Sequence, residues 1–193
     1  LCLGPTGCHS YRALPDAAVA EANGATFAQR DVEAIADDYL SALLEYHPEL
    51  GTRYSLPDAR HNRLTDNSPE ARIAWQARED AWLAELAVRG RPAEVGSRDW
   101  VTYGILYEAL ASSAAIRVCQ NELWAASSIT AWHRTVPGLF EIQPVDTPEL
   151  QRQALQRLAA LPKYIDIEIA NLRRGLESGY SAPRLTVAPA VNE

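Results

Sequence analysis

Apolar residues recur at helical spacing in several separate stretches of the chain. Steps of three and four residues place them on one face of an α-helix over about residues 27–46, 69–89, 97–118 and 147–176. Cap-then-proline pairs, Ser68-Pro69 and Thr147-Pro148, mark the starts of two of these helices. No stretch shows the sustained alternation that is typical of strands. The sequence therefore predicts an all-α fold, a bundle of about four principal amphipathic helices.

The last of these stretches carries the longest apolar stripe. Pro162 lies inside it, and a proline removes one backbone donor and crowds the preceding turn, so we expect a kink or brief break near Leu161. Gly175 and Gly179 provide stopping points. An apolar face of this length needs a partner that buries it. The stripe consists of Ala154, Leu158, Leu161, Ile165, Ile169, Leu172 and Leu176.

The other three stretches are expected to supply core residues. In the first, the apolar face comprises Val32, Ile35, Ala36, Tyr39, Leu40, Leu43 and Leu44. In the second and third, aromatic residues at helical spacing are interpreted as core rather than as cofactor contacts. These aromatic residues are Trp75, Trp82, Trp100, Tyr103 and Tyr107.

Two long segments, residues 47–68 and 125–146, lack a helical period and are predicted to be irregular. Segments of this length are often functional or packed as a unit, and in a helical protein they can line a cleft. The candidate cleft-lining residues are His61 and Asp66 in the first segment and Trp132, His133 and Arg134 in the second. The alternative is that the acidic residues serve turns, the arginines are solvated and His133 is a structural histidine.

Composition and charge exclude several classes of protein. The hydrophobic content of 47% is typical of a globular domain, and the net charge of −7 argues against binding to nucleic acid. No apolar run is long enough to span a membrane. The sequence contains no methionine, which indicates a processed or incomplete chain.

The three cysteines, Cys2, Cys8 and Cys119, are too few and too scattered for a disulfide framework. Gly7-Cys8 follows small and apolar residues, as at the end of a lipoprotein signal peptide. We therefore expect Cys8 to be a lipid-attachment site, residues 1–26 to be a signal remnant and tether, and the protein to lie in the cell envelope or periplasm. The alternative is an N-terminus with an incidental cysteine.

No catalytic or metal-binding residue can be assigned from the sequence. The four histidines are His9, His47, His61 and His133, and none forms the HExxH pattern that places two zinc ligands on one helix face. No phosphate-binding glycine-rich loop and no nucleophile elbow are present.

Three blocks of sequence carry a resemblance to a known family. They are residues 47–72 (HPELGTRYSLPDARHNRLTDNSPEAR), more weakly 99–110 (DWVTYGILYEAL), and 161–187 (LPKYIDIEIANLRRGLESGYSAPRLTV). They resemble the bacterial domain-of-unknown-function 885 family, whose members look like zinc metallopeptidases, and Gly51, Leu64 and Asp66 occupy its pattern positions. The family's His-Glu…Pro-Gly-His-His metal motif has no counterpart in this sequence.

The resemblance implies that residues 27–193 form the helical N-terminal part of a larger metallopeptidase-like domain. This part would shape the substrate cleft for a peptide, and zinc would belong to the full-length parent rather than to this chain. Apolar helix surface left uncovered without the rest of the parent would favour self-association. Two alternatives are a stand-alone helical binding or scaffold lipoprotein and an inactive truncated remnant.

Overall fold

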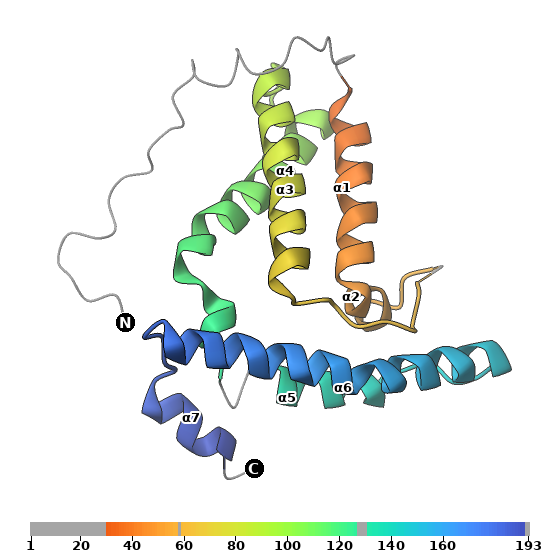
Figure 1. Cartoon of the computed structure of the whole chain (residues 1–193). Helices are drawn as coiled ribbons and strands as arrows, with labels where there is room; N and C mark the ends of the chain where they lie inside the picture. Colours follow the sequence, from red (N-terminus) through yellow and green to blue (C-terminus); the bar gives the residue numbers. More distant parts are fainter. Residues whose placement is uncertain (1–29, 58, 127–130, 192–193) are drawn as a thin grey trace. The chain divides into compact units, whose positions relative to one another are not determined.

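A computed structural model describes residues 30–57, 59–126 and 131–191 of the chain. By its internal contacts the chain divides into residues 1–30 and a unit formed by residues 31–193. The described part is helical and contains no strand, which confirms the predicted fold class. Its α-helices are α1 (Val32–Tyr46), α2 (Pro48–Arg53), α3 (Pro69–Arg89), α4 (Arg98–Ile116), α5 (Trp132–Glu141), α6 (Pro148–Glu177) and α7 (Arg184–Val191) (Figure 1). Two 3-10 turns, η1 (Arg117–Cys119) and η2 (Asn121–Leu123), follow α4.

Helices α3, α4 and α6 begin where the sequence predicts, because a polar side chain caps each one. Ser68 Oγ accepts a hydrogen bond from the Ala71 amide in α3, and Thr147 Oγ1 accepts one from the Leu150 amide in α6. Asp31 caps α1 in the same way, so this helix begins at Val32. The predicted start near residue 27 is too early, because Arg30 and Asp31 precede the helix and Asp31 is extended.

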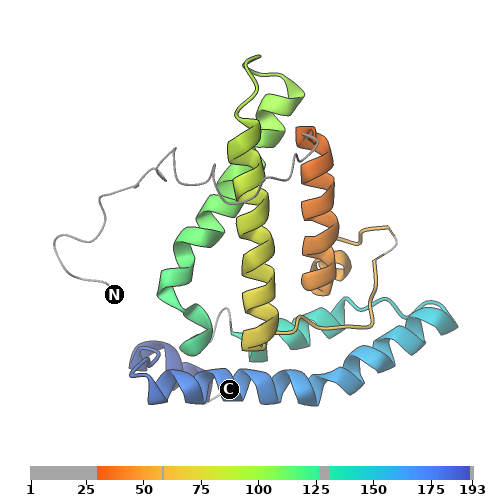
Figure 2. The ribbon, with the colours of Figure 1, turned by 45° about the horizontal axis from the view of Figure 1, so that its top comes forward.

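Helices α1, α3 and α4 pack together around the main hydrophobic core (Figure 2). The ring of Tyr46 stacks on Trp75 at a centroid distance of 4.7 Å, and the indole of Trp82 donates to Asp38 Oδ2 at 2.9 Å. Leu40, predicted to be core, is half exposed. The buried core residues are Val32, Ile35, Ala42, Trp75, Trp82, Leu86, Tyr103, Leu106 and Leu110.

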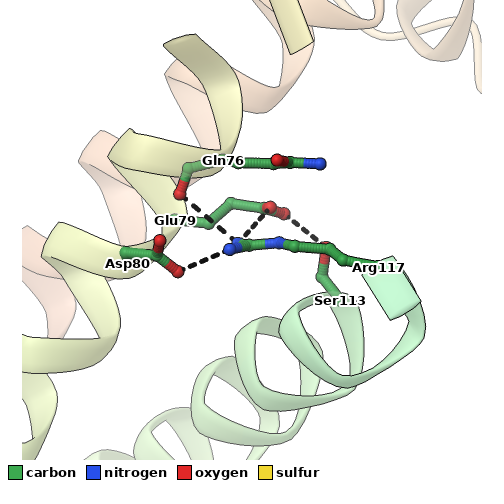
Figure 3. Close-up of polar contacts among 5 residues, drawn as sticks. All are labelled: Gln76, Glu79, Asp80, Ser113 and Arg117. Atoms are coloured by element: carbon green, nitrogen blue, oxygen red, sulfur yellow. Dashed lines mark hydrogen bonds and ion pairs between the residues drawn. The ribbon is translucent and has the colours of Figure 1, made fainter. Parts of the chain in front are cut away.

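A buried charged group joins α3 to the end of α4. Glu79 is only 4% exposed and accepts hydrogen bonds from Ser113 Oγ at 2.7 Å and from Arg117 Nη2 at 3.0 Å (Figure 3). Arg117 Nη1 also binds Asp80 Oδ1 at 2.7 Å. Because a buried carboxylate is tolerated only when it is paired, this cluster fixes the end of α4 on α3.

The two segments predicted to be irregular each contain a short helix. α2 lies in the first and α5 in the second, and Pro137 sits inside α5 without ending it. Pro137 has no backbone N–H, so α5 loses one hydrogen bond to its preceding turn. This lost bond lies near the start of the ten-residue helix, where the cost is tolerated. α6 likewise stays helical through Pro162 and curves rather than breaks (Figure 2).

The face of α6 that packs inward is polar. Its buried residues are Arg157, Glu168, Asn171 and Gly175, whereas every residue of the predicted apolar stripe is half-buried or exposed. Leu158 is 51% exposed and Leu176 is 66% exposed. The buried positions follow the same helical spacing but lie one residue before the apolar ones. The stripe is therefore not buried by α1, α3 or α4.

No helix in the described ranges is long and apolar enough to cross a membrane.

Candidate functional site

Arg157 organises the segment between α2 and α3. Its side chain is fully buried, and its Nε donates to the carbonyl oxygen of Arg63 at 2.9 Å. Its Nη1 donates to Thr52 Oγ1 at 2.9 Å and to Gln143 Oε1 at 2.5 Å, and its Nη2 donates to the carbonyl oxygen of Arg60 at 3.4 Å. One guanidinium thus ties α2, the segment that follows it and the residues after α5 to α6.

Burial lowers the pKa of Arg157 to about 10, and the nearby Glu49 carboxylate raises it in part. The side chain therefore remains a cation at neutral pH. Its hydrogen-bond acceptors are carbonyl, hydroxyl and amide oxygens. The positive charge is solvated by neutral dipoles inside the protein.

His61 belongs to the same network. Thr52 Oγ1 lies 2.8 Å from His61 Nδ1, the His61 amide donates to Gln153 Oε1 at 2.9 Å, and the His61 carbonyl accepts from Gln143 Nε2 at 3.2 Å. Burial and the Arg157 charge both lower the pKa of His61. Since Thr52 Oγ1 accepts from Arg157, its hydroxyl hydrogen is free to bind the unprotonated Nδ1 of a neutral His61.

A pocket of about 270 Å³ lies between α2, residues 65–67, α5 and α6. Its polar lining includes His47, Glu49, Arg53, Asn67 and Tyr164, and its apolar lining consists of Leu50, Val136 and Leu139. Val136 and Leu139 are buried residues of α5. We call this the α2–α6 pocket. It combines hydrogen-bonding groups with an apolar wall, as ligand sites commonly do.

Thr65 holds the acidic and basic groups of the α2–α6 pocket in place. Glu49 accepts from the Thr65 amide and from Thr65 Oγ1, both at 2.7 Å. Because Thr65 Oγ1 donates to Glu49, it accepts from His47 Nδ1 at 3.2 Å. Burial lowers the pKa of His47, an effect that the charges of Glu49 and Glu79 oppose. His47 is therefore neutral at pH 7.

Tyr164 lines the pocket from α6, and two further α6 residues, Glu168 and Asn171, hold the lining residue Asn67. Glu168 accepts from Asn67 Nδ2 at 2.5 Å, and Asn171 Nδ2 donates to the Asn67 carbonyl at 3.0 Å. Burial, followed by the charges of Glu168 and Glu49, raises the pKa of Tyr164. The Tyr164 hydroxyl thus stays protonated, and its hydrogen is bonded to Glu168.

The structure places the predicted cleft-lining residues at different positions. His61 is in the Arg157 network. Asp66 accepts from the Ser68 amide at 2.9 Å, and this hydrogen bond lowers the pKa of Asp66. The ring of Trp132 lies 6.5 Å from that of Tyr164 and 5.8 Å from that of His133, whereas Arg134 is an exposed residue of α5. Cys8 lies outside the described residues.

Among the predicted residues in the described ranges, Trp132 is the one whose ring contacts a side chain of the α2–α6 pocket. That side chain is Tyr164. Sequence reasoning missed Glu49, Asn67, Arg157 and Tyr164. A signal was present on α6, where residues 157, 164, 168, 171 and 175 share one face at helical spacing and none of them is aliphatic. That pattern indicates an inward polar face.

The described residues do not fit a zinc site. They contain no group of three or more His, Cys, Asp or Glu side chains that could hold a metal ion. His47 and Glu49 both line the α2–α6 pocket, and both oxygens of Glu49 already accept hydrogen bonds from Thr65.

Comparison with known proteins gives a family match. Residues 48–193 match the model of a family described as "Bacterial protein of unknown function (DUF885)". The match covers α2 to α7 and therefore the Arg157 network and every described lining residue of the α2–α6 pocket except His47. No curated protein matches the chain.

Proposed function

The chain belongs to the bacterial DUF885 family, and on this premise we propose that it shapes the peptide-binding cleft of a zinc-metallopeptidase-like protein. The observation that carries this proposal is the α2–α6 pocket, whose hydrogen-bonding groups face an apolar wall. A peptide presents backbone donors and acceptors beside apolar side chains, so such a lining suits it. Its volume is close to the lower end of the roughly 300–1,000 Å³ of drug-sized sites, which suits one or two residues of a peptide.

Each polar group of the pocket has a defined role in this proposal. The Tyr164 hydroxyl and the Asn67 side chain serve a peptide backbone as hydrogen-bonding groups, and Arg53 places a cation at the rim. Val136 and Leu139 accept an apolar side chain. The described residues bind and orient the peptide, and no step of the hydrolysis is assigned to them.

Photo-crosslinking tests this proposal. We would replace Arg53, at the pocket rim, with a photoreactive benzoylphenylalanine, and use Val88 on α3, which is 72% exposed, as the matched control position. The probes are short peptides blocked at both ends. We expect crosslinks from position 53 that unlabelled peptide competes away, and none above background from position 88. Equal crosslinking from both positions would sink the proposal.

A cell-envelope location and a lipid on Cys8 are part of the same proposal. They are supported by the Gly7-Cys8 junction and the alanine-rich residues that follow it. Mass spectrometry of the protein from its host should show an N-terminal modified cysteine. An unmodified chain that retains residues 1–7 would refute the lipid attachment.

A second function, a helical scaffold that binds another protein, is favoured by the exposed apolar residues of α6. Leu155 is 67% exposed, and Leu158 and Leu176 lie on the same helix with more than half of their surfaces exposed. Solvent-exposed leucines in a row often mark a protein interface. This alternative would be favoured if a protein partner binds and replacing these leucines abolishes the binding. It also requires that no peptide binds at α2.

A further inference from the structure

A second pocket, of about 330 Å³, borders α2 through residues other than those of the α2–α6 pocket. It lies between the C-terminal half of α1, α2 and residues 56–57 and 59–63, and we call it the α1–α2 pocket. Leu44, Pro48 and Leu56 contribute an apolar wall. The charged residues of its lining are Glu45, Arg60 and Arg63.

Among the described residues of its lining, two guanidinium groups share this pocket with the Glu45 carboxylate. No ion pair with Arg60 or Arg63 is found within the described ranges, and Arg63 Nε is enclosed by protein without a hydrogen-bond acceptor there. A buried donor without an acceptor costs about 1–3 kcal/mol, so this nitrogen of the Arg63 guanidinium is not stabilised by a protein acceptor in the described ranges. Arg63 also borders the small pocket beside α6, but there the lining includes Asp66 and Lys163, whose charges lie 4.0 Å apart and offset each other.

The backbone that carries both arginines is fixed before any ligand binds. The buried Arg157 guanidinium donates to the carbonyl oxygens of Arg60 and Arg63, and this holds the segment against α6. On the other side, Gly51 lets the segment approach α2, because an added Cβ would lie 2.8 Å from Ala59 Cβ. A segment held in this way loses less conformational entropy on binding.

We propose that the α1–α2 pocket binds a carboxylate group, with Arg60 and Arg63 as the cations that contact it. A guanidinium presents a planar fork that matches the two oxygens of a carboxylate. Among the described lining residues, two guanidinium groups and the Glu45 carboxylate carry the charge, and this cationic excess suits an anion. The apolar wall of Leu44, Pro48 and Leu56 suits a short aliphatic group attached to the carboxylate. The carboxylate can be the free C-terminus of a peptide or a small organic acid.

Side-chain NMR tests the proposal on the whole chain, with the Nε–H signals of the arginines as the readout. The probes are N-acetyl-dialanine, its C-terminal amide, propionate and inorganic phosphate. We expect saturable shifts of the Arg63 signal with N-acetyl-dialanine and none with its amide. Tighter binding of N-acetyl-dialanine than of propionate identifies a peptide C-terminus, and equal binding identifies a small carboxylate. Tighter binding of phosphate, or equal shifts with acid and amide, would overturn the proposal.

Variants test the role of each arginine. Arg60→Gln and Arg63→Gln remove a side-chain charge but keep the carbonyl that Arg157 binds, and each should weaken binding about tenfold or more. Arg173→Gln, at an exposed position of α6, is the matched control and should not change the affinity. If Arg60→Gln and Arg63→Gln both bind N-acetyl-dialanine with unchanged affinity, the assignment of the two arginines is contradicted. Because blocked peptides have no carboxylate terminus, failure here is distinguishable from failure of peptide binding at the α2–α6 pocket.

Discussion

Arg157 Nη1 and Thr52 Oγ1 lie 2.9 Å apart in the protein interior, although 105 residues separate them in the sequence. This contact joins the long helix α6 to the short helix α2. The same guanidinium holds the carbonyl oxygen of Arg63, so the backbone beside both pockets depends on one buried cation.

Arg157→Ala should therefore destabilise the fold strongly. The substitution leaves buried acceptors at Thr52 and Gln143 without their donor, and we expect a loss of about 3 kcal/mol or more in the free energy of unfolding. Arg173→Ala, on the exposed side of α6, is the control and should change stability by no more than about 0.5 kcal/mol. Urea unfolding followed by circular dichroism measures both. Similar unfolding midpoints for the two variants would contradict the central role of Arg157.

Gly175→Ala should destabilise the packing of η2 on α6. An added Cβ would lie 1.9 Å from the carbonyl oxygen of Leu123, which is a backbone atom and cannot move aside cheaply. Alanine would otherwise gain up to about 1 kcal/mol over glycine in a helix. Gly104→Ala in α4 is the matched control, since the nearest atom there is a side-chain nitrogen of Arg91 at 3.5 Å. We expect a lower melting temperature for the first variant and an equal or higher one for the second.

Lowering the pH should weaken the fold through His47. Its pKa in the folded protein is lower than the ordinary histidine value of 6.5, because burial disfavours the charged imidazole. The unfolded chain therefore takes up the proton first, and stability that is fully present above pH 6.5 is lost as the pH falls toward the folded pKa. His61 shifts in the same direction and adds to the loss. Urea unfolding at about pH 8 and pH 5.5 should show this decrease, and it should be smaller in His47→Gln. Stability that rises on acidification would contradict the burial of a neutral His47.

The sequence predicted the principal helices well because caps and apolar periods are local signals. Ser68 and Thr147 cap α3 and α6 as expected, and the aromatic residues Trp75 and Trp82 lie in the core. Helix α5 was missed because Pro137 and Gly138 are read as breakers, although a short helix tolerates both.

The site could not be predicted because the apolar period of α6 identifies the wrong face as buried. Leu158 is conspicuous in the sequence, yet the adjacent Arg157 is the residue that packs inward. A buried arginine is recognisable only once its acceptors are known, and those lie on α2 and on the segments that precede α3 and α6. These contacts are distant in sequence and leave no local pattern.

The exposed apolar face of α6 should promote self-association. Leu155→Gln combined with Leu158→Gln replaces two leucines that are 67% and 51% exposed, so the fold should lose little stability. We expect sedimentation velocity to show a smaller fraction of oligomer in this variant than in the unchanged chain. An unchanged chain that stays monomeric at high concentration would remove the argument that this face needs a partner.

The most direct test of the account is methyl NMR of the chain titrated with short peptides blocked at both ends. Val136 and Leu139 line the α2–α6 pocket, whereas Leu106 and Leu110 lie in the core formed by α1, α3 and α4. We predict saturable shifts of the Val136 and Leu139 methyl signals, weakened in Tyr164→Phe, with the Leu106 and Leu110 signals unchanged. Shifts confined to other parts of the chain, or no shifts at saturating peptide, would contradict the proposal that this pocket binds peptides.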